Sequence, residues 1–263
     1  MDLQHHLDEL TEQGFTLLPG FVDREITAAI RNYIDRALSV RTENQQYRDH
    51  TQFHHRICHP MEDPITVRLA CDRRLLEIAT RVLRAENLRL RQQMFMLTTP
   101  CGAEGPPRPD GWHIDTPFGP EEWNDSPRRV FLQVFAYCTP VRSGGAATMV
   151  IPRSHHKTYA AVAECPTEEA RRELCRDIVR NAGVDPSEAM EVICDEGDMV
   201  LFNPMMIHSG SNNISDQPRY AFHCSFHDAS AERIRHLPPV FYDRFPASME
   251  AAMPEDLRVL LER

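Results

Sequence analysis

The sequence predicts an α+β chain whose core is an antiparallel double-sheet jelly roll. Up to about residue 87 the apolar residues recur with a helical period, whereas from Leu88 onwards they lie in short strand-like segments separated by turn residues. The 263 residues suffice for one sizeable core, and no repeat, low-complexity linker or step in composition divides them. We therefore expect a single domain, residues 1–263, with a helical flank at about 1–87, the core at about 88–228 and a C-terminal extension at 229–263.

The N-terminal flank is expected to hold three helices and one short strand. A helix over residues 2–13 is followed by a strand over residues 15–19. Asp23 is placed to cap a helix that runs to about Leu38, because isoleucine recurs there at four-residue spacing. The helical period returns over residues 63–85, where we expect one further helix.

A polar, histidine-rich segment at residues 41–60 interrupts this pattern. Its clustered histidines follow the spacing i, i+4, i+5 and i+9, as His50, His54, His55 and His59. A second metal site is one interpretation, although no carboxylate or cysteine is interleaved at ligand spacing. We favour a lid or a substrate-facing loop, since loops commonly carry the variable contacts of an enzyme.

The core region is expected to hold six strands bounded by turn residues. They cover residues 88–97, 130–137, 147–152, 191–194, 198–203 and 220–228. His155 and His156 are assigned to a turn, residues 166–182 to a polar helical insertion, and residues 254–262 to a terminal helix. A jelly roll suits this order best because it can bring together polar residues that lie far apart in the sequence.

Charge and composition limit the possible partners. The 29 basic residues against 39 acidic ones give a net charge of −10 without a basic run, which argues against nucleic acid or an anionic membrane surface. No stretch of about 18 apolar residues occurs, and the acidic, polar N-terminus differs from a signal peptide. We therefore expect a cytoplasmic protein with eight free thiols, and no sequence feature specifies an oligomeric state.

Two histidines and one aspartate are placed as ligands of a single metal ion. His113 and Asp115 are one residue apart in extended sequence, so their side chains project to the same side. His208, in strand-like sequence much later, completes a 2-His-1-carboxylate set, which suits Fe(II) and leaves positions open for a co-substrate and oxygen. Arg219, on the following strand, offers a guanidinium that can pair bidentately with a carboxylate.

Five short segments, spread over roughly residues 7–228, form one ordered pattern. They are residues 14–21 (Gly-Phe-Thr-Leu-Leu-Pro-Gly-Phe), 112–115 (Trp-His-Ile-Asp), 144–148 (Gly-Gly-Ala-Ala-Thr) leading to 151–155 (Ile-Pro-Arg-Ser-His), 196–202 (Glu-Gly-Asp-Met-Val-Leu-Phe), and 207–212 (Ile-His-Ser-Gly-Ser-Asn) with 218–219 (Pro-Arg). In order and spacing the pattern resembles the phytanoyl-CoA dioxygenase family of Fe(II)/2-oxoglutarate-dependent oxygenases, which have a cupin-like double-stranded β-helix. Arg153 departs from the glycine that is common in this family, at a turn outside the ligand set.

The resemblance implies a role for each member of the ligand set. His113, Asp115 and His208 would be the catalytic metal ligands, and Arg219 would bind the far carboxylate of 2-oxoglutarate. Similar halogenases have a small residue at the position of Asp115, so a carboxylate there favours hydroxylation or a related oxidation.

Three further polar residues are candidates for the 2-oxoglutarate pocket. Gln133 lies among apolar residues, and Gln93 shares a strand face with the apolar Phe95 and Leu97. Both glutamines are therefore expected to point into the barrel. They could bind the co-substrate or the substrate, or have a structural role only. Thr148, in a strand of small residues, is the third candidate, while Phe118 and Trp123 could line the substrate pocket or pack in the core.

These features predict an Fe(II)- and 2-oxoglutarate-dependent oxygenase that uses O2 to hydroxylate an unactivated C–H bond of a small molecule, such as a specialised metabolite, releasing succinate and CO2. The same iron centre could instead give desaturation, cyclisation or epimerisation. A metal-binding cupin-like protein without oxygenase activity is the alternative from another class. No Gly-x-Ser-x-Gly, Walker, Gly-x-Gly-x-x-Gly or His-Glu-x-x-His motif competes with this interpretation.

Overall fold

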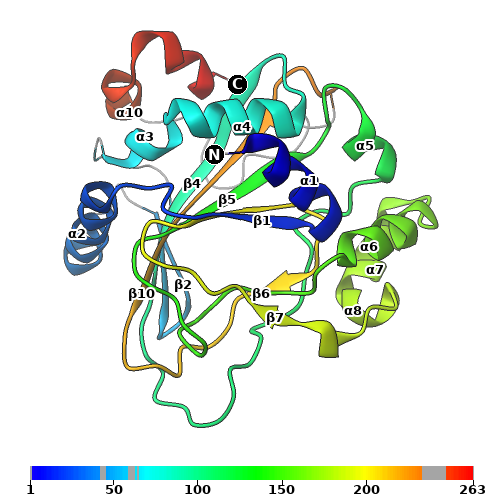
Figure 1. The fold of residues 1–263 in the computed structure, drawn as a ribbon, viewed down its shortest axis with the longest axis horizontal. Helices are drawn as coiled ribbons and strands as arrows, with labels where there is room; N and C mark the ends of the chain where they lie inside the picture. The colour runs from blue at the N-terminus through cyan, green and yellow to red at the C-terminus, as the bar shows by residue number, and fades with distance from the viewer. Residues whose placement is uncertain (1, 42–45, 59–62, 64, 233–246, 263) are drawn as a thin grey trace.

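Two antiparallel sheets form the centre of the computed structural model, which describes residues 2–41, 46–58, 63, 65–232 and 247–262 (Figure 1). The larger sheet has the strand order β1-β8-β5-β10-β4-β3-β2, and the smaller one has the order β7-β6-β9. The strands are β1 (Phe15–Leu18), β2 (Gln46–Thr51), β3 (His54–Cys58), β4 (Leu88–Thr98), β5 (Phe131–Tyr137), β6 (Met149–Val150), β7 (Met190–Glu191), β8 (Met199–Phe202), β9 (His208–Ser209) and β10 (Arg219–Asp228). The predicted mixed chain with a large antiparallel sheet is thereby confirmed.

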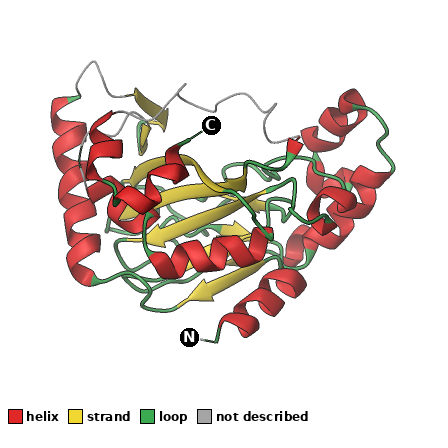
Figure 2. Cartoon of the chain, turned by 90° about the horizontal axis from the view of Figure 1, so that it is seen from above, coloured by secondary structure: helices red, strands yellow, loops and turns green. Residues whose placement is uncertain are grey.

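Helices surround the sheets. Their bounds are α1 (Leu3–Gln13), α2 (Arg24–Val40), α3 (Ile65–Ala70), α4 (Arg73–Leu83), α5 (Pro120–Asn124), α6 (Ser154–Ala163), α7 (Glu168–Arg176), α8 (Ile178–Asn181) and α10 (Ala247–Ala252), with 3-10 turns at Pro186–Glu188 and Glu255–Leu261. Figure 1 places α3, α4 and α10 on one side of the larger sheet and β6 and β7 on the other, and Figure 2 shows helices flanking the sheets on both sides. Within the described residues, no helix is long and apolar enough to cross a membrane.

The central strands of the larger sheet, β4, β10, β5 and β8, are mostly buried on both faces. Phe95 and Phe222 face the helices, in one core cluster with residues of α2 and α4. Met94 and Met96, their neighbours in alternation, face the smaller sheet in a second cluster. The space between the two sheets therefore lies against the face of β4 that carries Met94 and Met96.

The first helix and strand form as the sequence predicts. The Asp2 carboxylate accepts a hydrogen bond from the backbone N–H of His5, and Gly14 ends α1 with a φ of +86°. Strand β1 then pairs with β8. Helix α2 starts directly after Asp23, although the Asp23 side chain makes no capping hydrogen bond.

The prediction of a single helix over residues 63–85 is wrong. The described part of this stretch forms two helices, α3 and α4, which are separated at Asp72. The Asp72 carboxylate accepts a hydrogen bond from the N–H of Arg74 and so caps a new helix. An aspartate inside an apolar helical repeat is compatible with one continuous helix and with two helices. The sequence pattern alone therefore does not distinguish the two arrangements.

The prediction of a loop over residues 41–60 is also wrong, because most of the described part of this segment is a β-hairpin. Strands β2 and β3 pair with each other, and β3 adds to β4 as an extension of the larger sheet. Polar residues on both faces hide the alternation: the His54 and Arg56 side chains face a cavity, and β2 lies at the sheet edge. The helical face considered for the histidine cluster is excluded for His54 and His55, which lie in β3. His59 lies outside the described residues.

The core strands are placed as expected, but those of the smaller sheet are shorter. Strand β6 has two residues where six were expected, and β7 has two, which begin at Met190. Helix α6 was not expected, and it takes His155 and His156 into its first turn. Arg153, before this helix, has a φ of +61°, which explains why glycine is common at this turn in the family it resembles. The terminal helix expected over residues 254–262 is present as a 3-10 helix, Glu255–Leu261.

Candidate metal centre

A cavity of about 580 Å³ lies between the two sheets. Its polar lining comes from the inner face of the larger sheet, from His208 of β9 and Thr148 beside β6 in the smaller sheet, and from the segment before α5. The lining residues are Thr51, His54, Arg56, Gln92, Met94, Met96, Asp110, Gly111, His113, Asp115, Gln133, Phe135, Thr148, His208, Gly210, Arg219 and His223. A concave site with converging polar groups is the usual form of a small-molecule site.

Antiparallel register arranges one wall of this cavity in rows. Arg219, Thr98 and His54 lie side by side on β10, β4 and β3. The next row on the same face is Ala221, Met96 and Arg56, and the third contains His223, Met94 and Cys58. Successive rows are about 7 Å apart, because side chains on one face alternate every second residue.

The three expected metal ligands come together at the opposite wall. His113 and His208 form an isolated antiparallel bridge, in which each backbone N–H donates to the other's carbonyl at 3.0 Å. The N–H of Asp115 donates to the carbonyl of Pro204, also at 3.0 Å. One ligand atom from each of the three side chains lies within 4.8 Å of the others, so a single ion can be reached by all three.

Hydrogen bonds to backbone carbonyls orient both imidazoles. Nδ1 of His113 lies 2.9 Å from the carbonyl of Gly111, and Nδ1 of His208 lies 2.9 Å from that of Met206. A carbonyl only accepts, so each Nδ1 carries the proton and each Nε2 keeps its lone pair for a metal. Burial, together with the nearby His208, lowers the pKa of His113, which favours the neutral ring that a metal ligand requires.

Asp115 supplies the carboxylate of the set. Its Oδ1 lies 3.7 Å from Nε2 of His208, and its buried Oδ2 has no hydrogen-bond partner among the described residues. An unpartnered carboxylate oxygen beside two imidazole lone pairs is costly unless a cation is bound. The donor set therefore fits a divalent transition metal, and its two nitrogens and one carboxylate suit Fe(II).

Arg219 is buried at the base of the cavity, with an exposed fraction of 6%. Its guanidinium donates to the carbonyl of Ala146, and one amino group lies 3.1 Å from Oγ1 of Thr98 and 3.3 Å from Nε2 of His54. Nε has no partner, and within the described chain no carboxylate reaches ion-pair distance. Burial lowers the pKa of Arg219, yet a guanidinium stays charged in proteins, so this site is ready to bind an anion.

The glutamines do not lie as expected. Gln93 is buried on the helix-facing side of β4 and does not line the cavity, whereas its neighbour Gln92 does. Gln133 faces the cavity as expected, and its Oε1 accepts a hydrogen bond from Nε2 of His223. Thr148 also lines the cavity, where its hydroxyl bonds to that of Tyr137 at 2.8 Å.

Four further charged or titratable residues line the cavity. Asp110 and His223 were not expected from the sequence, whereas His54 and Arg56 belong to the segment, residues 41–60, that was favoured as a lid or a substrate-facing loop. Nδ1 of His54 lies 3.7 Å from Oδ2 of Asp110. The placement of His223 could have been found from the sequence, because it follows Arg219 by four residues and so shares its face of the strand.

Phe118 and Trp123 pack in the core and do not line the cavity. Phe118 is fully buried, and its ring centroid lies 5.9 Å from that of Phe131. The guanidinium of Arg128 lies over the ring of Trp123. Of the two roles considered for these aromatic side chains, the structure supports core packing.

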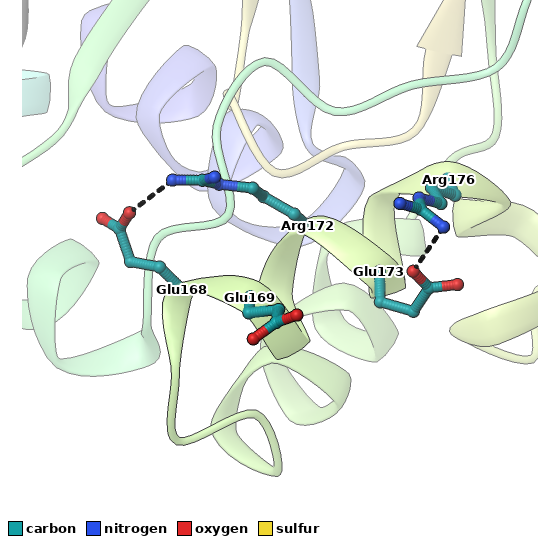
Figure 3. Close-up of a pocket in the computed structure, with 5 residues that line it drawn as sticks. All are labelled: Glu168, Glu169, Arg172, Glu173 and Arg176. Atoms are coloured by element: carbon teal, nitrogen blue, oxygen red, sulfur yellow. Dashed lines mark hydrogen bonds and ion pairs between the residues drawn. The ribbon is translucent and has the colours of Figure 1, made fainter.

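A second hollow lies over α7 and lacks converging groups (Figure 3). All its lining residues, Glu168, Glu169, Arg172, Glu173 and Arg176, come from this one helix. Two exposed ion pairs, Glu168–Arg172 and Glu173–Arg176, neutralise most of the charge. Such pairs are typical of a solvated helix face, and we assign this hollow no function.

Comparison with solved structures identifies similar folds. SnoN, an epimerase in complex with Fe3+, alpha ketoglutarate and nogalamycin RO, is 18% identical, with 92% of each chain covered and a TM-score of 0.64. HygX from Streptomyces hygroscopicus, with nickel, 2-oxoglutarate and hygromycin B bound, is 17% identical over 91% of this chain and 97% of HygX, with a TM-score of 0.61. SnoK, a non-heme alpha ketoglutarate-dependent carbocyclase from nogalamycin biosynthesis, is 18% identical over 90% of this chain and 91% of SnoK, with a TM-score of 0.58.

These identities show a shared fold. The metals and the 2-oxoglutarate in those structures are of the cofactor class expected from the sequence. No curated protein sequence matches the chain. A family model described as phytanoyl-CoA dioxygenase (PhyH) matches residues 10–221, and this confirms the resemblance seen in the five segments. The chain belongs to the phytanoyl-CoA dioxygenase family.

Proposed function

We propose that this chain is an Fe(II)- and 2-oxoglutarate-dependent oxygenase that hydroxylates an unactivated C–H bond of a small molecule. The observation that carries the proposal is that one cavity contains both the three candidate metal ligands and the buried Arg219. No carboxylate of the described residues forms an ion pair with this arginine. We also propose that the chain is one domain, in which the two sheets form a double-stranded β-helix. Family membership and the similar fold of SnoN, HygX and SnoK support these assignments.

Different residues would bind the metal and the co-substrate. His113, Asp115 and His208 would hold Fe(II) from one side and leave the cavity side open. Arg219 would bind the far carboxylate of 2-oxoglutarate bidentately, through Nε and an amino group, while Thr98 and the Ala146 carbonyl hold its guanidinium in place. When bound, Fe(II) and 2-oxoglutarate supply the oxidation of the substrate by O2, with release of succinate and CO2.

The remaining candidates have more limited roles. Thr148, which lines the cavity and bonds to Tyr137, would contact the co-substrate. Gln133 is held by His223 and can present its amide N–H groups to a bound molecule. Gln93 lies outside the cavity lining, and we propose a structural role for it.

The same centre could instead complete an epimerisation or a cyclisation. This second proposal is favoured by the similarity to the epimerase SnoN and the carbocyclase SnoK. Product mass separates the outcomes, because hydroxylation adds an oxygen atom, desaturation or oxidative ring closure removes two hydrogens, and epimerisation leaves the mass unchanged. A metal-binding protein without oxygenase activity would form no product.

An anaerobic titration tests the proposal. Apo protein receives Fe(II) and then 2-oxoglutarate, and a weak visible charge-transfer band should develop as the keto acid chelates the iron. The Asp115→Ala variant should lose this band, whereas Arg142→Ala, which removes an exposed arginine paired with Asp195, should retain it. Iron binding without any band in the wild type would contradict a 2-oxoglutarate mechanism.

A further inference from the structure

Arg56 remains a charged group without a role after the metal and the co-substrate are assigned. His113, Asp115 and His208 belong to the metal, and Arg219 belongs to 2-oxoglutarate. Of the other charged cavity residues, Asp110 lies beside His54, and His54 contacts Arg219. Arg56 lines the same cavity, and no hydrogen bond or ion pair reaches its guanidinium from the described part of the chain.

The position of Arg56 is set by the hairpin that the sequence did not reveal. It lies on β3, directly opposite Met96 of β4. It therefore occupies the row next to that of Arg219, two strands away from it. Thr51, at the other end of the hairpin, lines the cavity and is exposed, so this side of the cavity meets solvent.

An arginine in such a place normally has an acceptor. Arg31, also partly buried, bonds to the Glu196 carboxylate and to the carbonyl of Cys138. Arg171 bonds to backbone carbonyls and lies 3.8 Å from the Glu122 carboxylate. The Nε of Arg56 is buried and has neither kind of partner. Leaving a buried guanidinium nitrogen without an acceptor is costly, and a bound anion would remove that cost.

The other residues that line the cavity indicate the rest of the ligand. Met94, Met96 and Phe135 supply apolar contacts on the same wall. Gln92 and His223 each present a buried, unpartnered atom, the Oε1 of Gln92 and the Nδ1 of His223. Nε2 of His223 donates to Gln133, so its Nδ1 is an acceptor. These groups suit a molecule with an apolar body and an N–H or O–H donor, in addition to an anionic group.

We propose that Arg56 binds a carboxylate of the primary substrate, and that the substrate is consequently a small organic acid. The inference rests on the proposed function, because it assumes that Arg219 and the metal ligands are taken by 2-oxoglutarate and iron.

Matched binding titrations test this assignment. The protein is saturated with Ni(II) and 2-oxoglutarate, and benzoate and benzamide are titrated separately by calorimetry. The two probes share a flat aromatic body and differ in charge. The wild type should bind benzoate about tenfold or more tightly than benzamide, since a charge-assisted hydrogen bond contributes more than a neutral one. Arg56→Gln should abolish this preference, and Arg56→Lys should retain part of it.

Arg48→Gln is the matched control. Arg48 lies directly opposite Arg56 on the neighbouring strand β2, is exposed and does not line the cavity. Its variant removes the same charge from the same hairpin and should keep the preference for benzoate. Equal affinities of the wild type for the two probes, undetectable benzoate binding, or a preference that survives Arg56→Gln would each overturn the proposal.

A titration with 2-oxoglutarate separates this proposal from the proposed function. Arg56→Gln should leave the affinity for 2-oxoglutarate unchanged. A loss of 2-oxoglutarate affinity in this variant would place Arg56 in the co-substrate site and overturn the assignment to the primary substrate. If the wild type itself does not bind 2-oxoglutarate, the proposed function fails, whatever the benzoate titration gives.

Discussion

His113 and His208 lie far apart in the sequence, yet they exchange both backbone hydrogen bonds at 3.0 Å. Their rings are 4.4 Å apart between centroids, and each Nδ1 donates to a carbonyl two residues earlier in its own segment. Backbone pairing thus sets the spacing of the two imidazoles, and the carbonyls set their orientation. The fold itself therefore sets the arrangement of the candidate metal ligands.

Loss of one imidazole should therefore remove metal binding without unfolding the protein. We expect His208→Ala to lower Fe(II) affinity by more than about 100-fold, because loss of even an indirect partner of a ligand typically costs 10- to 100-fold. Equilibrium titration with Fe(II) under anaerobic conditions measures the change. His156→Ala, which alters an exposed histidine outside the cavity, should bind Fe(II) like the wild type. Unchanged affinity in His208→Ala would exclude this residue as a ligand.

Arg219 should determine the affinity for 2-oxoglutarate and not that for the metal. Arg219→Ala is expected to weaken 2-oxoglutarate binding by about 2–5 kcal/mol, the usual cost of truncating one partner of a buried charge pair. Arg219→Lys should recover only part, since an ammonium lacks the two-pronged geometry. Calorimetric titration of the Ni(II)-loaded variants measures both effects. Equal 2-oxoglutarate affinity in the wild type and Arg219→Ala would refute the anchor role.

Two buried histidines should make the fold less stable in acid. Burial lowers the pKa of His155 to about 4 and that of His223 to about 3. Above pH 6.5 these rings are neutral in both the folded and the unfolded chain. Between pH 6.5 and about 4 the unfolded chain takes up protons that the folded chain does not. The free energy of unfolding should therefore decrease as the pH is lowered through this window, by up to about 1.4 kcal/mol per pH unit for each histidine.

Urea unfolding at pH 7 and pH 5 measures this loss. His155→Gln removes one of the two groups and can keep the bond to the Thr11 carbonyl, so the loss between the two pH values should be smaller than in the wild type. His5→Gln, at an exposed position of α1, should leave the loss unchanged. If His155→Gln loses as much stability as the wild type, burial of His155 is not the cause.

Gly14 should tolerate no side chain. It has a φ of +86°, and a Cβ there would lie 2.7 Å from Nδ1 of His155 and 3.0 Å from Sδ of Met206. We expect Gly14→Ala to lower the free energy of unfolding by about 2–4 kcal/mol, from backbone strain and overpacking together. Gly20 also has a positive φ, but a Cβ would meet nothing within 4 Å. Gly20→Ala should cost about 1 kcal/mol, and equal costs in urea unfolding would argue against the packing term.

The sequence by itself determined which residues are proposed to bind the metal and the co-substrate. A His-x-Asp pair in extended chain must project both side chains to one side, whatever the rest of the fold does. The later His208 and Arg219 follow an order and spacing specific to one family, and the family match confirms that resemblance. The start of α2 after Asp23 was also predictable, because the apolar spacing of the helix begins in the residues that follow it.

Only the tertiary structure decided which residues complete the cavity. Sequence alternation separates Gln92 from Gln93, but it cannot say which face of β4 points inward when helices cover one face and the second sheet covers the other. The hairpin that carries His54 and Arg56 was hidden for a related reason. His54 and Arg56 are polar because they face a cavity, so the apolar alternation that marks a strand does not appear in this part of the sequence.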